Sequence, residues 1–533
     1  KGSGGDASRM TGLIDALDSF VAAELVDELV EHFLSVVESL SNTDRFAIWC
    51  ALLGRTNQWK NYFDPGTMPA RDNLSKLEKL AEQIKPNDEL ADVLRACSLE
   101  DYELVDLDDF RESQRASNEI RVTLMRPIYE MHGLGIVERL LARGAKPHLL
   151  GSVLAQIHLN DEEQDGILQT LDSADDDRAC LAATYVRTKQ HQFGWNWVDA
   201  LSLREWPANR IALFFASTPC ESSVWIRAER TLGNRGREYW MKAGRLCQLD
   251  DVVYVEHYVL KMLDVDRVRE ALEAAGHAVL HEITISTDVA FNVLDALKEA
   301  SINTMNSYYV KSILKFLEEK MPGNRLFYTE WRFAAILIHE KDSYLFKRMA
   351  QDPVAFINMV VIANGGGSGL IKEFSFKSSP RARIHTRMVV LASWNIVPGY
   401  DEKGSFDESG FSYWINNAKR KAAELNCIEL AELEMGRNFF HAQSVSSESF
   451  IPEPIADFLE SSDQACIGYG VESFNSRGIH TIDETGKEEE SFAISYDKKA
   501  VLAEERGHLK FAATLRSVAD QFRREARRNR SRE

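Results

Sequence analysis

The sequence predicts an all-α fold: a degenerate α-solenoid of HEAT- or TPR-like helix pairs, followed by a distinct C-terminal helical domain. Apolar residues recur at spacings of three and four along most of the chain, which is the period of an amphipathic helix. The breaks between these stretches are short and carry Gly, Pro, Asn or Asp. A chain of 533 residues suits an array in which each helix pair buries its apolar face against its neighbours. We describe the repeats as degenerate because no strict tetratricopeptide or ankyrin period is present.

Four stretches show the helical period most clearly. In the first, Val26, Val30 and Phe33 form an apolar stripe, and acidic residues fill the opposite face. The four stretches are 26–37, 255–262, 310–317 and 511–522, and the breaks lie at 64–66, 85–87, 143–145 and 321–323. Alternation typical of strands is scarce, and only 282–286 and 383–391 are candidates for short strands.

Composition divides the chain into four parts. Residues 1–9 resemble the remnant of a tag or linker, and residues 10–364 form the predicted helical-repeat domain. The Gly-Gly-Gly-Ser-Gly run at 365–369 resembles an engineered flexible linker that replaces a loop, and a natural glycine-rich loop is the alternative. Residues 370–533 form the predicted C-terminal helical domain, which ends in a long helix.

The charge balance and the cysteines exclude several classes of protein. The net charge of −19 argues against a general nucleic-acid binder, because phosphate neutralisation needs a basic face. The seven cysteines are widely spaced and include no CxxC pair, which indicates a reducing compartment, and we expect a cytoplasmic protein. The longest apolar stretch, 354–363, is shorter than the roughly 20 residues of a membrane helix, so we expect no membrane association.

No catalytic signature is present, and we expect a protein that is not an enzyme and that has no cofactor and no metal. The chain contains no HExxH, CxxC, GxxxxGK[ST] or GxSxG motif. Arg437 and His441 are weak catalytic candidates, because an Arg and a His on one helical face could polarise a phosphodiester and move its proton. The basic cluster at 381–387 is a second candidate of this kind, so an RNA-cleaving helical enzyme is one alternative function.

Three polar groups are candidates for partner binding, each with a structural alternative. The loop at 475–480 could grip a carboxylate or phosphate, or it could only lock a turn. The acidic segment could steer a basic protein partner, or it could form solvated loops. The Arg-rich tail could contact an acidic partner or a nucleic-acid backbone, or it could only complement the dipole of the last helix. The candidate residues are Asn475, Ser476, Arg477 and His480 in the loop, Asp106, Asp108 and Asp109 in the acidic segment, and Arg523 and Arg527 in the tail.

Several motifs between residues 225 and 528 resemble the C-terminal helical-repeat region of large, mostly uncharacterised bacterial proteins. The motifs are Glu238-Tyr239-Trp240, Asp352-Pro353-Val354-Ala355-Phe356, Asn475-Ser476-Arg477-Gly478-Ile479, Asp483-Glu484-Thr485-Gly486, Tyr496, and Phe511-Ala512-Ala513-Thr514-Leu515-Arg516 followed by Ala519, Glu525 and Ala526. The resemblance implies a bacterial, cytoplasmic helical-repeat protein. Such proteins often belong to multi-domain machines, including antiviral defence systems.

Together these observations predict a non-catalytic protein-binding scaffold, sensor or regulatory module. The resemblance narrows this expectation to a bacterial antiviral system that is CRISPR- or NTPase-linked, with control by proteolysis at the replaced loop. We expect a protein partner, and we expect nucleic acid as a partner only through the Arg-rich tail. The RNA-cleaving enzyme and the nucleic-acid adaptor remain the two alternatives.

Overall fold

The computed structural model confirms the all-α fold class. It describes residues 23–62, 71–105, 109–246, 251–297, 304–338, 340, 343–365, 380–401, 403–442, 451–477 and 485–530. Within these ranges the regular elements are helices, and β-pairing is limited to two isolated bridges, Cys220 with Leu246 and Tyr400 with Phe406. None of the helices in the described ranges combines the length and the apolar character that crossing a bilayer would require.

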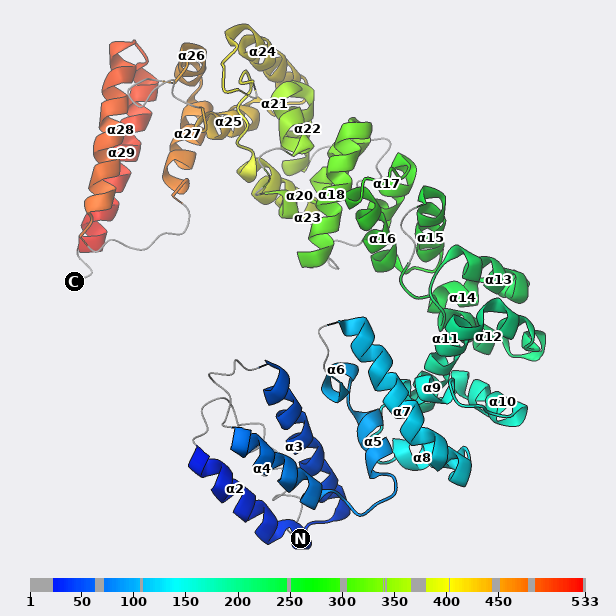
Figure 1. The fold of residues 1–533 in the computed structure, drawn as a ribbon. Coiled ribbons are helices and arrows are strands. Elements are labelled where there is room, and N and C mark those ends of the chain that lie inside the picture. The colour runs from blue at the N-terminus through cyan, green and yellow to red at the C-terminus, as the bar shows by residue number, and fades with distance from the viewer. Residues whose placement is uncertain are drawn as a thin grey trace. The chain divides into compact units, whose positions relative to one another are not determined.

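The chain forms two compact units, residues 1–248 and 249–533, which are described separately. Figure 1 shows the helices of each unit packing mainly against those next to them in the chain. The helices of the first unit are α2 (Ala23–Val36), α3 (Asn42–Tyr62), α4 (Arg71–Ile84), α5 (Ala91–Ser98), α6 (Asp101–Leu104), α7 (Phe110–His132), α8 (Gly135–Leu141), α9 (Pro147–Leu154), α10 (Asp161–Gln169), α11 (Asp176–Asp199), α12 (Ala208–Ala216), α13 (Ser222–Leu232) and α14 (Arg237–Lys242).

The second unit holds the features from which the candidate sites are built. Its helices are α15 (Val252–Asp264), α16 (Val268–Leu280), α17 (Thr287–Ala296), α18 (Thr304–Lys320), α19 (Asn324–Arg332), α20 (Ala334–Leu337), α21 (Tyr344–Gln351), α22 (Pro353–Ala363), α23 (Pro380–His385), the π-helix η6 (Thr386–Leu391), α24 (Glu408–Glu424), α25 (Ile428–Phe439), α26 (Glu453–Ser461), α27 (Asp463–Asn475), α28 (Lys487–Glu505) and α29 (Leu509–Arg530). One hydrophobic core extends through this unit from Phe327 to Phe522. Residues on both sides of the predicted domain boundary at 365–369 contribute to this one core. The boundary itself stays a prediction.

The apolar stripes predicted in α15, α18 and α29 are buried, whereas Leu34 in the stripe of α2 is 40% exposed. Val255, Tyr258, Val259 and Met262 of α15 are at most 1% exposed, and so are the stripe residues of α18. The expectation of strands was wrong at both places. Residues 383–391 lie in α23 and η6, where the Thr386 hydroxyl donates to the Ala382 carbonyl 2.8 Å away and accepts from the Trp331 indole at 2.9 Å. Residues 282–286 form the connection that leads into α17.

Two glycines, one on each helix, let α25 and α27 pack closely together. A Cβ atom added at Gly468 would lie 2.0 Å from the Leu433 carbonyl oxygen, and one at Gly436 would lie 2.0 Å from the Ala465 oxygen. The backbones of the two helices therefore touch, and only glycine fits at either position.

The hairpin of α28 and α29 has the repeat of an antiparallel coiled coil. Buried residues on α28 follow a three-four spacing at Ala493, Tyr496, Ala500 and Ala503, and larger side chains of α29 pack opposite them. Ion pairs at seven-residue intervals flank this core: Glu490 with Arg530, Asp497 with Arg523, and Glu504 with Arg516. Because the interval is seven residues on both helices, the same face of each helix meets its partner along the hairpin.

Candidate protein-interaction groove

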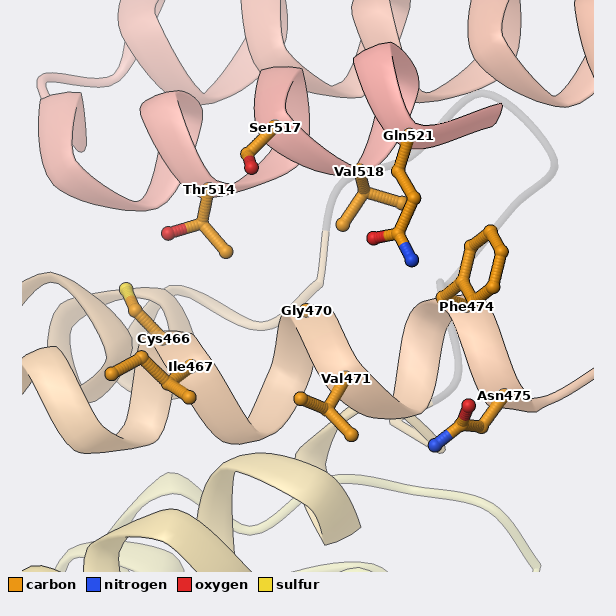
Figure 2. A pocket seen from close by; sticks show the side chains of 10 residues that line it. All are labelled: Cys466, Ile467, Gly470, Val471, Phe474, Asn475, Thr514, Ser517, Val518 and Gln521. Carbon is orange, nitrogen blue, oxygen red and sulfur yellow. The ribbon is translucent and has the colours of Figure 1, made fainter. Parts of the chain in front are cut away.

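A groove of about 370 Å³ lies between α27 and α29. Figure 2 shows the side chains of α29 pointing toward α27 across it. Its lining residues are Cys466, Ile467, Gly470, Val471, Phe474 and Asn475 from α27, and Thr514, Ser517, Val518 and Gln521 from α29. The α27 side is therefore mainly apolar, and the α29 side carries hydroxyl and amide groups.

At Gly470 the absence of a side chain lets the side chains of α29 approach α27 closely. A Cβ atom there would lie 3.3 Å from the Thr514 methyl carbon and 3.7 Å from a methyl carbon of Val518. Gly468, two residues earlier, contacts the backbone of α25 instead. The two glycines thus let α27 lie close to both neighbours: Gly468 contacts the backbone of α25, and Gly470 lies next to side chains of α29.

The groove exposes apolar surface that the fold itself does not cover. Ile467 is 51% exposed and Val471 is 44% exposed, whereas most other apolar residues of α27 are buried. The residues that line the groove carry no formal charge. Basic residues continue the same edge of α29 beyond the groove, with Lys510 one turn before Thr514 and Arg524 one turn after Gln521. Lys510 pairs with Asp463 of α27 at 2.7 Å.

The candidate residues of the predicted loop at 475–480 lie in different surroundings, some at the groove and some inside the fold. Asn475 ends α27 and lines the groove (Figure 2). Ser476 closes the helix, because its amide donates to the Glu472 carbonyl at 2.8 Å and its hydroxyl to the Ser473 carbonyl at 3.2 Å. His480 lies outside the described residues.

Arg477 is occupied inside the fold, which corrects its prediction as a partner contact. Its guanidinium donates to Glu489 at 2.9 Å and to Glu525 at 3.2 Å. The same group lies over the rings of Phe492 and Phe522, 5.2 and 5.6 Å from their centroids. The side chain is only 8% exposed, so the structure favours the alternative in which Arg477 locks the turn.

Arg437 and His441 both contact the carboxylate of Glu472 and do not face each other across a cleft. The helix α25 ends at Phe439, so His441 lies beyond it and the expected shared helical face is wrong. Both side chains point to Glu472, which lies 3.1 Å from Arg437 and 3.9 Å from His441. Burial lowers the pKa of His441 despite the nearby Glu472 carboxylate, which acts in the opposite direction. His441 lines a second cleft of about 740 Å³, and Arg437 is not among the residues that line that cleft.

The other basic and acidic candidates also have structural roles. His385, in the 381–387 cluster, contacts the Trp331 carbonyl oxygen at 2.8 Å. Asp109 caps α7, where its carboxylate accepts the amide of Arg111 at 2.7 Å, while Asp106 and Asp108 lie outside the described residues. Arg523 pairs with Asp497 and Asp520, and the Arg527 side chain donates to the Arg523 carbonyl oxygen at 3.3 Å.

One cluster of possible metal ligands was missed from the sequence. Glu453 and Asp457 of α26 and His508, just before α29, place their ligand atoms within 4.8 Å of one another. The two carboxylates are four residues apart, a spacing that is common on solvated helices. His508 lies 51 residues beyond Asp457, so nothing local in the sequence links it to them.

Comparison with known proteins does not assign the chain to a protein family. No family model, no curated protein and no solved structure matches it. The resemblance to bacterial helical-repeat proteins therefore stays a prediction, and the argument for function rests on the groove and its surroundings.

Proposed function

We propose that this protein is a non-catalytic helical-repeat scaffold and that the groove between α27 and α29 binds one amphipathic helix of a protein partner. The observation that carries the proposal is the exposed apolar stripe of Ile467 and Val471 along the groove that they line together with Gly470. Apolar surface of this kind is costly in water and is typical of docking sites.

The shape of the stripe favours a helical partner. Ile467, Gly470, Val471 and Phe474 follow the spacing i, i+3, i+4, i+7 along α27. At a rise of about 1.5 Å per residue the stripe is about 10 Å long, which matches two turns of a partner helix. A helix that docks in a groove presents apolar anchors at the same spacing.

The charges around the groove favour an acidic flank on that helix. Arg524 lies on the groove edge of α29 one turn beyond Gln521, whereas Lys510, at the other end, pairs with Asp463 of α27 at 2.7 Å. The groove itself carries no charge. A partner helix with Asp or Glu beside its apolar anchors would meet Arg524 at its end of the groove, and the polar groups of Thr514, Ser517 and Gln521 along the groove. The small size of the groove predicts a weak or transient contact if this helix binds alone.

A displayed library of amphipathic helices of roughly 15 residues tests the proposal. The library is sorted on the purified full chain, and enriched helices are then measured against variants by fluorescence anisotropy. We expect the enriched helices to carry apolar anchors with an acidic flank. We expect them to lose at least tenfold in affinity for Ile467→Asp/Val471→Asp and for Gly470→Trp.

The chain offers a matched control for this experiment. Ile494 and Val501 of α28 lie outside the groove, and they are 53% and 46% exposed, close to the values for Ile467 and Val471. The variant Ile494→Asp/Val501→Asp should bind the selected helices as the wild type does. The absence of any enriched helix, or equal losses in the two double variants, would refute the proposal.

The narrower role in bacterial antiviral defence rests on the motif resemblance alone. A regulatory site at 365–369 would require cleavage there, and residues 366–369 lie outside the described residues. A partner co-purified from the native host and competed away by a selected helix would identify the pathway.

A further inference from the structure

Glu453, Asp457 and His508 converge where α26 meets the turn between α28 and α29. The Nε2 atom of His508 lies 3.0 Å from Oδ1 of Asp457 and 3.7 Å from Oε1 of Glu453. Glu453 and Asp457 are one turn apart on α26, so their side chains share a face of that helix. One imidazole and two carboxylates therefore meet from two segments of the chain.

We propose that these three residues form a binding site for Zn²⁺ or a similar divalent transition metal. Zinc binds imidazole nitrogen and carboxylate oxygen at about 2.0–2.1 Å in a tetrahedron, which places neighbouring ligand atoms about 3.3 Å apart. The two separations from His508 lie on either side of that value, and all three ligand atoms lie within 4.8 Å of one another. Rotation of the two exposed carboxylate side chains would bring the ligand atoms to the tetrahedral spacing. An imidazole ligand favours a transition metal over Mg²⁺ or Ca²⁺, which prefer oxygen ligands only.

The surrounding contacts hold the ligands in place. The His508 side chain is only 5% exposed, and its backbone amide donates to the Ala503 carbonyl at 2.9 Å. Glu460, on the same face of α26, accepts the amides of Lys510 at 3.1 Å and Phe511 at 3.0 Å. These bonds dock α26 onto the start of α29 and order the site before a metal binds.

The outer side of the site is open to solvent. The Asp457 side chain is 69% exposed, which leaves room for a water molecule as the fourth ligand of a tetrahedral ion. Arg506 would weaken metal binding, because its positively charged guanidinium lies 3.3 Å from Oε2 of Glu453. Oε1, the oxygen that faces His508, is the one that the metal would use.

Competition between the full-length protein and a chromophoric chelator for Zn²⁺ tests the proposal. We expect one zinc site of micromolar or tighter affinity. Asp457→Asn and His508→Gln should each weaken zinc binding at least tenfold. Arg506→Gln should tighten it severalfold, because it removes a positive charge beside the metal.

The matched control is His132, which lies 3.1 Å from Glu89 and belongs to no group of three possible ligands among the residues that the structure describes. His132→Ala should leave the zinc affinity unchanged. Asp457 is exposed, so Asp457→Asn is expected to fold normally, and its circular dichroism spectrum checks this. Zinc should also raise the melting temperature of the wild type but not that of Asp457→Asn. The proposal would be overturned if the wild type, Asp457→Asn and His508→Gln bound zinc with equal affinity, or if Arg506→Gln bound it more weakly than the wild type. Either result is independent of whether the groove binds a partner helix.

Discussion

Replacement of Gly468 by alanine should destabilise the second unit, whereas replacement of Gly470 should not. The new Cβ atom at Gly468 would lie 2.0 Å from the Leu433 oxygen and 3.0 Å from the Arg437 nitrogen. Non-bonded heavy atoms prefer about 3.5 Å, so α25 would have to move by more than about 1 Å. The obstacles are backbone atoms of a packed helix, which cannot rotate away.

The size of the effect follows from two opposing terms. Overpacking costs about 3 kcal/mol when the neighbour is rigid, and alanine gains about 1 kcal/mol over glycine inside a helix. Gly468→Ala should therefore lose about 2 kcal/mol of stability. At Gly470 the nearest atom is the Thr514 methyl carbon at 3.3 Å, which a side-chain rotation relieves. Gly470→Ala should therefore keep most of the helix-propensity gain.

Thermal unfolding followed by tryptophan fluorescence measures both variants, because Trp394 and Trp414 are buried in the core of this unit. At about 2–4 °C per kcal/mol, Gly468→Ala should lower the melting temperature by about 4–8 °C. Gly470→Ala should leave it unchanged or raise it slightly. A melting temperature of Gly468→Ala at or above that of the wild type, or equal shifts in both variants, would refute the close contact between α25 and α27.

Two further predictions concern buried charges. Burial raises the pKa of Glu330 to about 7. The folded state therefore binds the carboxyl proton of Glu330 more tightly than the unfolded chain does. The free energy of unfolding should fall by about 3 kcal/mol as the pH rises from about 4.5 to 7. Glu330→Gln should remove this part of the pH dependence, so its melting temperature should exceed that of the wild type at pH 8 but not at pH 4. Melting temperatures of the two proteins that change in parallel with pH would contradict this. Arg477→Met should destabilise the protein by about 3 kcal/mol in urea titrations, because it leaves the fully buried Glu489 without its cation. Adding Glu489→Leu should recover most of that loss, and no recovery would show that the pair is not coupled.

The helices were predictable because their signal is local. The stripe from Val255 to Met262 repeats at the helical period, and any helix with that stripe buries it against a neighbour. The prediction failed at 383–391, where basic and apolar residues alternate as in a strand. The bonds of Thr386 to Ala382 and to the Trp331 indole hold that segment in helical form, and Trp331 is far away in the sequence.

The sites were less predictable, because they depend on pairs of helices. Asn475 was a sequence candidate and does line the groove, but the groove itself forms only where α27 faces α29. Arg437 and His441 suggested a catalytic pair on one helix. In the structure both turn to Glu472 of α27, whose position the sequence does not reveal.

The sequence by itself determined that this protein is built of helices, where most of the clearest ones lie and which faces they bury. These properties follow from the spacing of apolar side chains within a few turns. Only the tertiary structure decided that Arg477 is used internally, that α27 and α29 leave a groove, and that His508 meets Glu453 and Asp457. The physical reason is that charge pairing, close packing and ligand geometry act between atoms a few ångströms apart, and those atoms come from residues 12 to 55 positions apart in the chain.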